Sequence, residues 1–262
     1  MLSKNQIKKI RGLQLKKNRQ AEGLFLVEGA KILEELLATA NTEDWVGTYQ
    51  IDKLWITEQF ASKNKRQLDA LSTLAWELAD EQSLIQAGTL QSNNAGIATI
   101  RFLKPSLSKS TQLIEKEGLT LVLDDLKDPG NLGTIIRLAD WYGIKQLFCS
   151  PETVDCFNPK VVAASMGSLF RVQIQYCDLS NFLAQYKNKI PIYAAVLKGQ
   201  NVHHTPMAAQ GLLLIGSESH GVNPDLLPLV DVPLTIPRFG KAESLNAAIA
   251  TAILIDNWRK GV

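Results

Sequence analysis

The stretch LTLVLDDLKDPGNLGTIIR, residues 119–137, passes from an apolar segment through a polar turn into a helical pattern. Its apolar start, Leu119–Leu123, predicts a buried strand, and Pro129 with the glycine after it predicts a turn. Asn131 then stands where a helix N-cap is expected, and the predicted helix covers residues 132–142. A strand that leads directly into a helix is the building unit of a parallel α/β sheet.

The same alternation continues to the end of the chain and predicts a parallel sheet with helices on both faces. Two further polar segments, LLLIGSESHG at 212–221 and TIPRFGKAESLN at 235–246, also follow or close apolar runs. Because ligand sites in α/β folds lie beyond the carboxyl ends of strands, the three polar segments predict one site. Strands are expected at 119–123, 146–149, 170–174, 192–196, 211–215 and 232–236, and helices at 132–142, 159–166, 179–187 and 244–259.

The N-terminal part of the chain, residues 1–103, is predicted to form a smaller α/β unit. Residues 104–118, KPSLSKSTQLIEKEG, gain Pro, Ser and Lys and lose the apolar rhythm, which is typical of a linker. The second domain is therefore expected to cover 119–262. Within the first unit, strands are expected at 25–27, 53–57, 75–78 and 96–103, and helices from Gly29 to Ala40, over 58–71, and from the N-cap candidate Asp80 to Gly88.

Positive charge is concentrated at the N-terminus. The chain of 262 residues has a formal net charge of +2, but its first twenty residues carry seven cations and no acid. Such an arm is attracted to phosphate backbones, although a run of charge is also typical of a solvated helix face. The candidate RNA contacts are Lys8, Lys9, Arg11, Lys16, Lys17 and Arg19.

Composition argues against a membrane protein and a metalloprotein. The longest apolar stretch, residues 247–255, is half of the roughly 18 residues that a membrane span needs, and the N-terminus lacks a signal-peptide pattern. We expect a cytoplasmic protein. The three cysteines form no CxxC pair, and the adjacent His203 and His204 have poor spacing for ligands, so no metal is implied.

Common nucleotide fingerprints are missing from the sequence. No GxGxxG occurs, and the segment GSESHG lacks the Lys-Ser/Thr that follows the last glycine of a phosphate-binding loop. The sequence therefore supports neither a Rossmann dinucleotide site nor a P-loop. The glycines of this segment instead allow close approach of another backbone or of a flat ligand.

In chain order, the three polar segments read Asn-x5-Arg, Gly-x-Glu-x2-Gly and Ile-Pro-x6-Ser-Leu-Asn. This succession resembles the three motifs of the SpoU (TrmH-like) ribose methyltransferases of the SPOUT superfamily. Residues 1–103 look like the α/β substrate-binding domain that many members carry in front. The resemblance implies a catalytic domain with a C-terminal trefoil knot, an exception to the rule that chains do not thread their own loops.

The resemblance also implies a cofactor and an assembly. Members hold S-adenosylmethionine in the loops of the knot, mainly through backbone groups and apolar side chains, and they build the active site across a homodimer of catalytic domains. The matching cofactor positions here are Ile215, Gly216, Gly221, Ile236 and Leu245. One departure follows Ile236-Pro237, where the family commonly has a small or apolar residue such as Met and this chain has Arg238 and Phe239.

The reaction that the resemblance implies is in-line methyl transfer to a ribose 2′-hydroxyl of RNA, with orientation supplying much of the rate. Arg137 is often given the role of general base in this family, but a guanidinium stays protonated in proteins. We expect Arg137 to bind a neighbouring phosphate and to stabilise the developing alkoxide. The positions that match the polar residues around the reacting ribose are Asn131, Arg137, Glu218, Ser244 and Asn246.

Other functions remain open from the sequence. The front domain favours ribosomal RNA over tRNA as the substrate. A second hypothesis is an RNA-binding or ribosome-assembly factor on the same scaffold whose catalysis has lapsed. A third is methylation of a base or a protein side chain, with Glu218 as proton acceptor. The joint presence of all five polar residues argues against the lapsed factor, because a pure binder needs no such set.

Overall fold

The computed structural model describes residues 1–40, 42–43, 45, 49–71, 73–102, 114 and 117–261. The chain divides into two compact units, one of Met1–Ser108 with Asp155–Arg171 and one of Lys109–Val154 with Val172–Val262. Most of the predicted linker, residues 104–118, lies outside the described residues.

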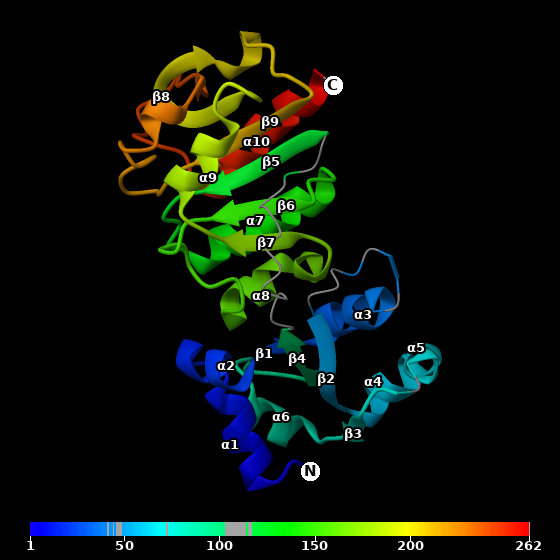
Figure 1. The fold of residues 1–262 in the computed structure, drawn as a ribbon. Coiled ribbons are helices and arrows are strands. Elements are labelled where there is room, and N and C mark those ends of the chain that lie inside the picture. Colours follow the sequence, from blue (N-terminus) through cyan, green and yellow to red (C-terminus); the bar gives the residue numbers. More distant parts are fainter. Residues whose placement is uncertain are drawn as a thin grey trace. The chain divides into compact units, whose positions relative to one another are not determined.

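The first unit contains a four-stranded sheet in the order β1-β4-β2-β3 (Figure 1). Strand β4 pairs antiparallel with both β1 and β2, while β3 pairs parallel with β2. The predicted strands of this unit are confirmed. Its elements are α1 (Lys4–Gly12), α2 (Lys16–Glu22), β1 (Leu24–Glu28), α3 (Ala30–Thr39), β2 (Tyr49–Ile56), α4 (Glu58–Lys63), α5 (Lys65–Ala70), β3 (Trp76–Leu78), α6 (Glu81–Ala87), β4 (Gly96–Phe102), α8 (Pro159–Ser165) and the 3-10 turn η1 (Ser168–Phe170).

One predicted helix of the first unit is two helices. The sequence predicts a single helix over 58–71, but the chain leaves helical geometry at Asn64, between α4 and α5. The side-chain amide of Asn64 donates to the carbonyl of Phe60 at 3.0 Å, and its own carbonyl starts the next helix by accepting from Leu68. An asparagine that bonds its own backbone in this way competes with continuation of a helix. The N-cap at Asp80 is confirmed, because its carboxylate accepts from the backbone of Ser83.

Residues 155–171 lie between two strands of the second unit in sequence but pack into the first unit. Phe157 stacks on Phe25 with ring centroids 4.6 Å apart and on Phe102 at 5.1 Å, and Phe170 stacks on Trp45 at 5.2 Å. This aromatic cluster makes the segment part of the hydrophobic core of the first unit. The sequence places this helix with residues 119–262, because a helical pattern alone does not show which core the helix packs into.

The second unit is built on a six-stranded, entirely parallel sheet in the order β10-β8-β9-β5-β6-β7. The predicted parallel α/β sheet is confirmed. Its elements are β5 (Gly118–Leu123), α7 (Pro129–Trp141), β6 (Gln146–Cys149), β7 (Gln173–Tyr176), α9 (Leu179–Tyr186), β8 (Ile192–Asn201), η2 (Val202–His204), β9 (Gln210–Ile215), η3 (Leu227–Leu229), β10 (Val232–Thr235) and α10 (Ala247–Lys260).

Both faces of this sheet are covered. On one face, Val122 and Leu212 pack with Phe182 of α9 in a single apolar cluster. Successive side chains of a strand point to opposite faces, so Leu121 and Leu213 point the other way, and both are also fully buried. Helices α7 and α10 pack on each other within this unit (Figure 1). Coverage of both faces explains why the strands read as continuous apolar runs.

Two strands differ from their predicted ranges. The strand expected at 170–174 is displaced to β7, because Ser168–Phe170 form a 3-10 turn that buries Leu169 and Phe170. Strand β8 continues past the predicted end at Val196 to Asn201 and pairs there again with β10 after a register shift. A Cβ atom on Gly199 would lie 2.6 Å from the carbonyl oxygen of Pro233, so a glycine is needed for this close approach.

Candidate active site

The three polar segments follow strands of the same parallel sheet. The first comes after β5, the second after β9 and the third after β10. Strands β5 and β9 are neighbours and end in register, with Leu123 opposite Ile215. Because carboxyl ends of parallel strands share one edge of a sheet, the first two segments start side by side.

One side chain from each segment meets in a hydrogen-bonded cluster. The amide of Asn131 donates to the carboxylate of Glu218, and the amide of Asn246 donates to the side-chain oxygen of Asn131 at 2.8 Å. These bonds join positions that are 87 and 115 residues apart in sequence. The structure therefore brings Asn131, Glu218 and Asn246 together, as the sequence predicts. We call these three residues the polar cluster.

Asn131 is placed by the first turn of α7, but it is not the N-cap. Asp128 is the cap, and its carboxylate accepts from the backbone N–H of Asn131 at 2.7 Å. Pro129 takes the first helical position, where its missing N–H costs no hydrogen bond. This corrects the predicted cap and leaves the Asn131 side chain, on a residue only 9 % exposed, available to the cluster.

Asn246 both caps α10 and joins the cluster. Its side-chain oxygen accepts from the backbone N–H groups of Ala248 and Ile249, and its amide nitrogen donates to Asn131. The sequence predicts Ser244 as the cap, but the helix begins at Ala247, so this prediction is wrong. Ser244 is exposed and makes no hydrogen bond within the described part of the chain.

The segment after β9 is a loop that closes on itself. Ser217 and Gly221 exchange two backbone hydrogen bonds of 3.0 and 2.9 Å, and Gly221 has a φ of +72°, which favours glycine. A Cβ atom on Gly216 would lie 2.2 Å from the carbonyl carbon of Gly221. Both glycines are therefore needed for the narrow neck from which Glu218 reaches Asn131. We call residues 216–221 the glutamate loop.

Arg137 lies further along α7 and is exposed. Among the described residues its guanidinium has no hydrogen-bond or ion-pair partner, and no bond links it to the polar cluster. A guanidinium that is always protonated and has no internal partner can bind an external anion such as a phosphate. Arg238, the departure noted in the third segment, is also exposed and donates to the carbonyl of Ala242 at 3.4 Å.

Sequence reasoning missed Asp124, the first residue after β5. Its residue is only 5 % exposed, and its carboxylate accepts from the backbone N–H of Asn223 at 2.8 Å. Burial raises the pKa of Asp124 above its ordinary value, the neighbouring charges of Asp125 and Glu152 act in the same direction, and the bond from Asn223 opposes them. The available signal was an acid placed directly at the end of a buried, mostly apolar strand.

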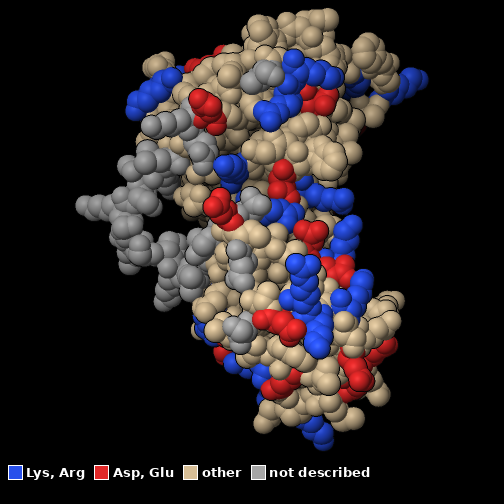
Figure 2. All heavy atoms as spheres, turned by 90° about the vertical axis from the view of Figure 1, so that its right-hand side faces the viewer, with Lys and Arg blue, Asp and Glu red and all other residues tan. Residues whose placement is uncertain are grey.

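The basic arm forms helices α1 and α2 of the first unit. Lys8, Arg11, Lys16 and Lys17 are exposed, and Lys9 is exposed but lies 3.6 Å from Glu22. Figure 2 draws the right-hand side of Figure 1, away from α1 and α2, and on that face basic and acidic side chains are interspersed. The exposed cations of the arm stay candidate RNA contacts.

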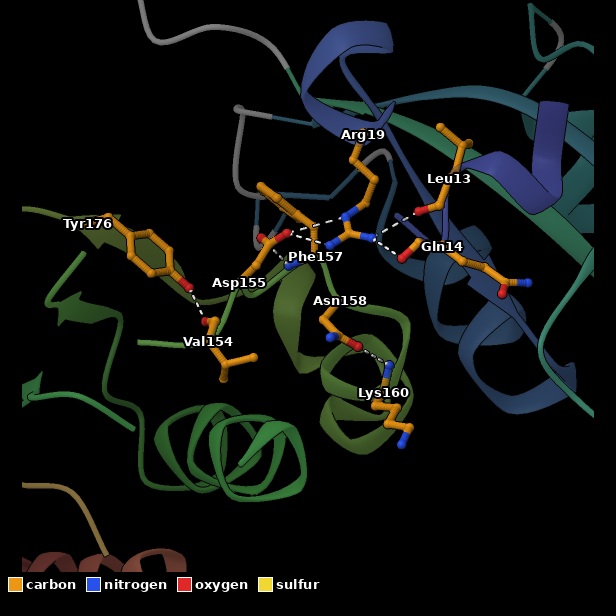
Figure 3. A network of polar contacts seen from close by, with 9 residues as sticks. All are labelled: Leu13, Gln14, Arg19, Val154, Asp155, Phe157, Asn158, Lys160 and Tyr176. Atoms are coloured by element: carbon orange, nitrogen blue, oxygen red, sulfur yellow. Dashed lines mark hydrogen bonds and ion pairs between the residues drawn. The ribbon is translucent and has the colours of Figure 1, made fainter. Parts of the chain in front are cut away.

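Arg19 does not belong with the exposed cations. It is only 3 % exposed, and its guanidinium donates to the carboxylate of Asp155 and to the carbonyls of Leu13 and Gln14 (Figure 3). The shortest of these bonds, to Asp155, is 2.6 Å. All of its donor groups point into the first unit, which corrects the prediction that Arg19 contacts RNA.

Within the described residues, no group of His, Cys, Asp and Glu is arranged to hold a metal ion. No helix in that part of the chain is both long and apolar enough to cross a membrane.

The three motifs on one sheet edge agree with a known family. Residues 118–256 match the SpoU rRNA Methylase family. The chain belongs to this family. Residues 4–83 match the MRM3-like substrate binding domain, which covers the basic arm and most of the sheet of the first unit. The resemblance drawn from the three motifs is thereby confirmed.

Relatives extend over the whole chain. The 23S rRNA (guanosine(2553)-2′-O)-methyltransferase RlmP of Bacillus subtilis is 28 % identical over 264 aligned residues, which cover 98 % of this chain and 97 % of that protein. A solved TrmH-family structure from Porphyromonas gingivalis is 36 % identical, with a TM-score of 0.81 over 99 % of both chains. The AdoMet-bound rRNA methyltransferase of Sinorhizobium meliloti is 26 % identical, also with a TM-score of 0.81, over 99 % of this chain and 96 % of its own.

The SpoU-family site fits S-adenosylmethionine. Ile215 is buried at the end of β9, and the backbone of Gly216 and Gly221 forms the neck of the glutamate loop. Ile236 is half-buried after β10, and Leu245 remains 47 % exposed. Backbone groups beside apolar side chains suit a cofactor that is held without a set of charged side chains. The individual cofactor contacts stay predictions.

Proposed function

We propose that this SpoU-family methyltransferase transfers a methyl group from S-adenosylmethionine to a ribose 2′-hydroxyl of ribosomal RNA. The observation that carries the proposal is the polar cluster, in which Asn131, Glu218 and Asn246 come from three separate motifs and bond to one another. Similarity over nearly the whole length to a ribosomal RNA 2′-O-methyltransferase supports both the reaction and the substrate.

The bound cofactor supplies an electrophilic methyl group on a positively charged sulfur, and Ile215, Gly216, Gly221, Ile236 and Leu245 are the residues proposed to hold it. The protein must hold the 2′-oxygen in line with that methyl group. Positioning of this kind can supply a large part of the barrier reduction without a strong base. The bond between Asn131 and Asn246 fixes the direction of both amides, so they can present donors and acceptors to the ribose.

Arg137 supplies positive charge to the reaction. As the 2′-hydroxyl loses its proton, negative charge develops on the oxygen, and a nearby guanidinium stabilises it. The same group can bind the phosphate next to the target ribose through two parallel hydrogen bonds. Its lack of a partner among the described residues supports this role, and Ser244, exposed beyond the polar cluster, is proposed to orient the RNA.

Three finer features belong to the same proposal: a C-terminal trefoil knot, a homodimer through the catalytic domain, and a cytoplasmic location. Exposed apolar side chains on α7 and α10 support the homodimer. Trp141 is 83 % exposed on α7 and Ile249 is 54 % exposed on α10. Large apolar groups exposed on two adjacent helices favour an interface with a second copy.

Two experiments test the function. In calorimetric titration, S-adenosylmethionine and S-adenosylhomocysteine are both expected to bind, and failure of both to bind would favour a lapsed RNA-binding factor. Reaction with ribosomal RNA, followed by nuclease digestion and mass analysis, is expected to place the methyl group on a ribose. Methyl groups on a base, or transfer to tRNA alone, would overturn the proposal. Mapping ribose methylation in a deletion strain then identifies the nucleotide.

A further inference from the structure

Both ends of the glutamate loop are tied to Asp124. The backbone N–H of Asp124 donates to the carbonyl of Ile215, the residue before the loop, at 2.8 Å. The carboxylate of Asp124 accepts from the backbone N–H of Asn223, two residues after the loop, also at 2.8 Å. A single residue at the end of β5 thus holds the start and the return of the loop.

The loop has little internal freedom of its own. The paired hydrogen bonds between Ser217 and Gly221, with Gly216 packed against the backbone of Gly221, close its neck. These internal contacts fix the shape of the loop, but they do not fix its position over the end of the sheet. That position decides whether Glu218 reaches the amide of Asn131.

We propose that Asp124 is a positioning residue for methyl transfer, acting through the glutamate loop by its carboxylate-to-backbone hydrogen bond. This role requires a hydrogen-bond acceptor at this position and does not require a negative charge. No Lys or Arg among the described residues pairs with Asp124, and an uncharged acceptor of the same shape can also receive the Asn223 N–H. The effect on the reaction rests on the proposed function, but the effect on the loop does not.

Substitutions at Asp124 separate geometry from charge. Asp124→Asn keeps an acceptor oxygen at the same reach and removes the charge. Asp124→Glu keeps the charge but adds a methylene group in a buried position, which must displace the loop. Asp124→Ala removes the acceptor altogether. If the Ala variant does not fold, the Asn and Glu pair still decides the question.

The matched control is Asp231. Its carboxylate also accepts from a backbone N–H, that of Ile192 at 3.0 Å, but at the start of β8, at the end of the sheet opposite the site. It pairs with Lys187 at 3.1 Å as well, so Asp231→Ala removes the same kind of bond together with an ion pair, and it does not touch the loop.

The direct measurement is amide hydrogen exchange of residues 216–223 in the full chain, with methyl transfer measured in parallel. In Asp124→Ala and Asp124→Glu we expect exchange in this segment to rise about tenfold, the size of one lost hydrogen bond, and the methyl-transfer rate to fall by a similar factor. Asp124→Asn and Asp231→Ala should keep wild-type exchange in the segment and the wild-type rate.

Three results would overturn the proposal: unchanged loop exchange in both Ala and Glu variants, an Asn variant that behaves like the Ala variant, or equal effects of Asp231→Ala on the loop. If loop exchange changes in the variants but the wild type transfers no methyl group, the role of Asp124 in placing the loop stands and the proposed function is refuted.

Because burial raises the pKa of Asp124, Asp124→Asn should also unfold at a slightly higher temperature than the wild type at pH 7. That gain should vanish below about pH 3, where both residues are neutral.

Discussion

Polar groups serve opposite purposes in the interior of the first unit and at the site edge of the second. The guanidinium of Arg19 donates hydrogen bonds to Asp155 and to two backbone carbonyls inside the first unit. At the site edge, the polar cluster is bonded internally but lies partly open, and Arg137 has no partner in the described part of the chain. Fully satisfied buried groups hold a fold, whereas groups with unused capacity can bind a substrate.

The largest expected effect is on stability, at Arg19. Arg19→Ala leaves the carboxylate of Asp155 without its cation and two carbonyls without their donor. We expect the free energy of unfolding of the first unit to fall by about 3–5 kcal/mol, as for other buried ion pairs that lose one partner. Denaturant unfolding measures the loss. Arg11→Ala, which removes an exposed arginine from α1, is the control, and equal unfolding midpoints for the two variants would refute the structural role of Arg19.

The sequence predicted most of the architecture because apolar periodicity is local information. Five of the six strands of the second unit lie on predicted apolar runs, β7 being the exception, and the resemblance carried by the three motifs indicated the polar cluster. The prediction for Arg19 was wrong because its ion-pair partner, Asp155, lies 136 residues away in sequence. A local count of charges does not reveal that this distant segment packs into the first unit. The two cap predictions failed because each helix start offers two residues of cap type. These are Asp128 and Asn131 before α7, and Ser244 and Asn246 before α10, and propensity alone does not choose between them.

The second prediction concerns activity, which should fall much more than stability. Asn246→Asp keeps an oxygen that caps α10 but loses the amide that donates to Asn131, and it adds a second carboxylate near Glu218. We expect methyl transfer to fall about 100-fold through misplacement of the reacting groups. The free energy of unfolding should fall by only about 1–3 kcal/mol, the cost of leaving the Asn131 oxygen without its donor, because Asp and Asn cap helices equally well.

Asn158→Asp is the matched control for this change. Asn158 caps α8 in the first unit by accepting from the backbone of Lys160 at 2.9 Å, and it has no bond to the polar cluster. Its substitution should leave methyl transfer at the wild-type rate. If Asn246→Asp retained full activity, the hydrogen bond between Asn246 and Asn131 would have no part in the reaction.

A smaller effect is expected at Arg137, where the variant tests whether the side chain stabilises charge or acts as a general base. Arg137→Lys keeps the charge but loses the planar fork of donors, so we expect a fall in rate of about tenfold, the size of one charge-assisted hydrogen bond. Complete inactivity of the lysine variant would favour a general base or an obligatory two-bond contact. Arg259→Lys, at the far end of α10, should have the wild-type rate and serves as the control.

The smallest effect per residue is expected in the basic arm, where the exposed cations contrast with buried Arg19 in the same helix. Lys16→Gln should leave the unfolding midpoint unchanged, because Lys16 is exposed and has no partner among the described residues. If the arm contacts phosphates, the variant lowers RNA affinity for every sequence alike and reduces the slope of log K against log salt by about one.

Lys53→Gln is the comparison, because Lys53 already pairs with Glu77 at 2.5 Å and its charge is largely neutralised. Identical salt slopes for Lys16→Gln and the wild type would show that Lys16 is not part of the RNA interface. RNA would then be bound by other residues of the first unit.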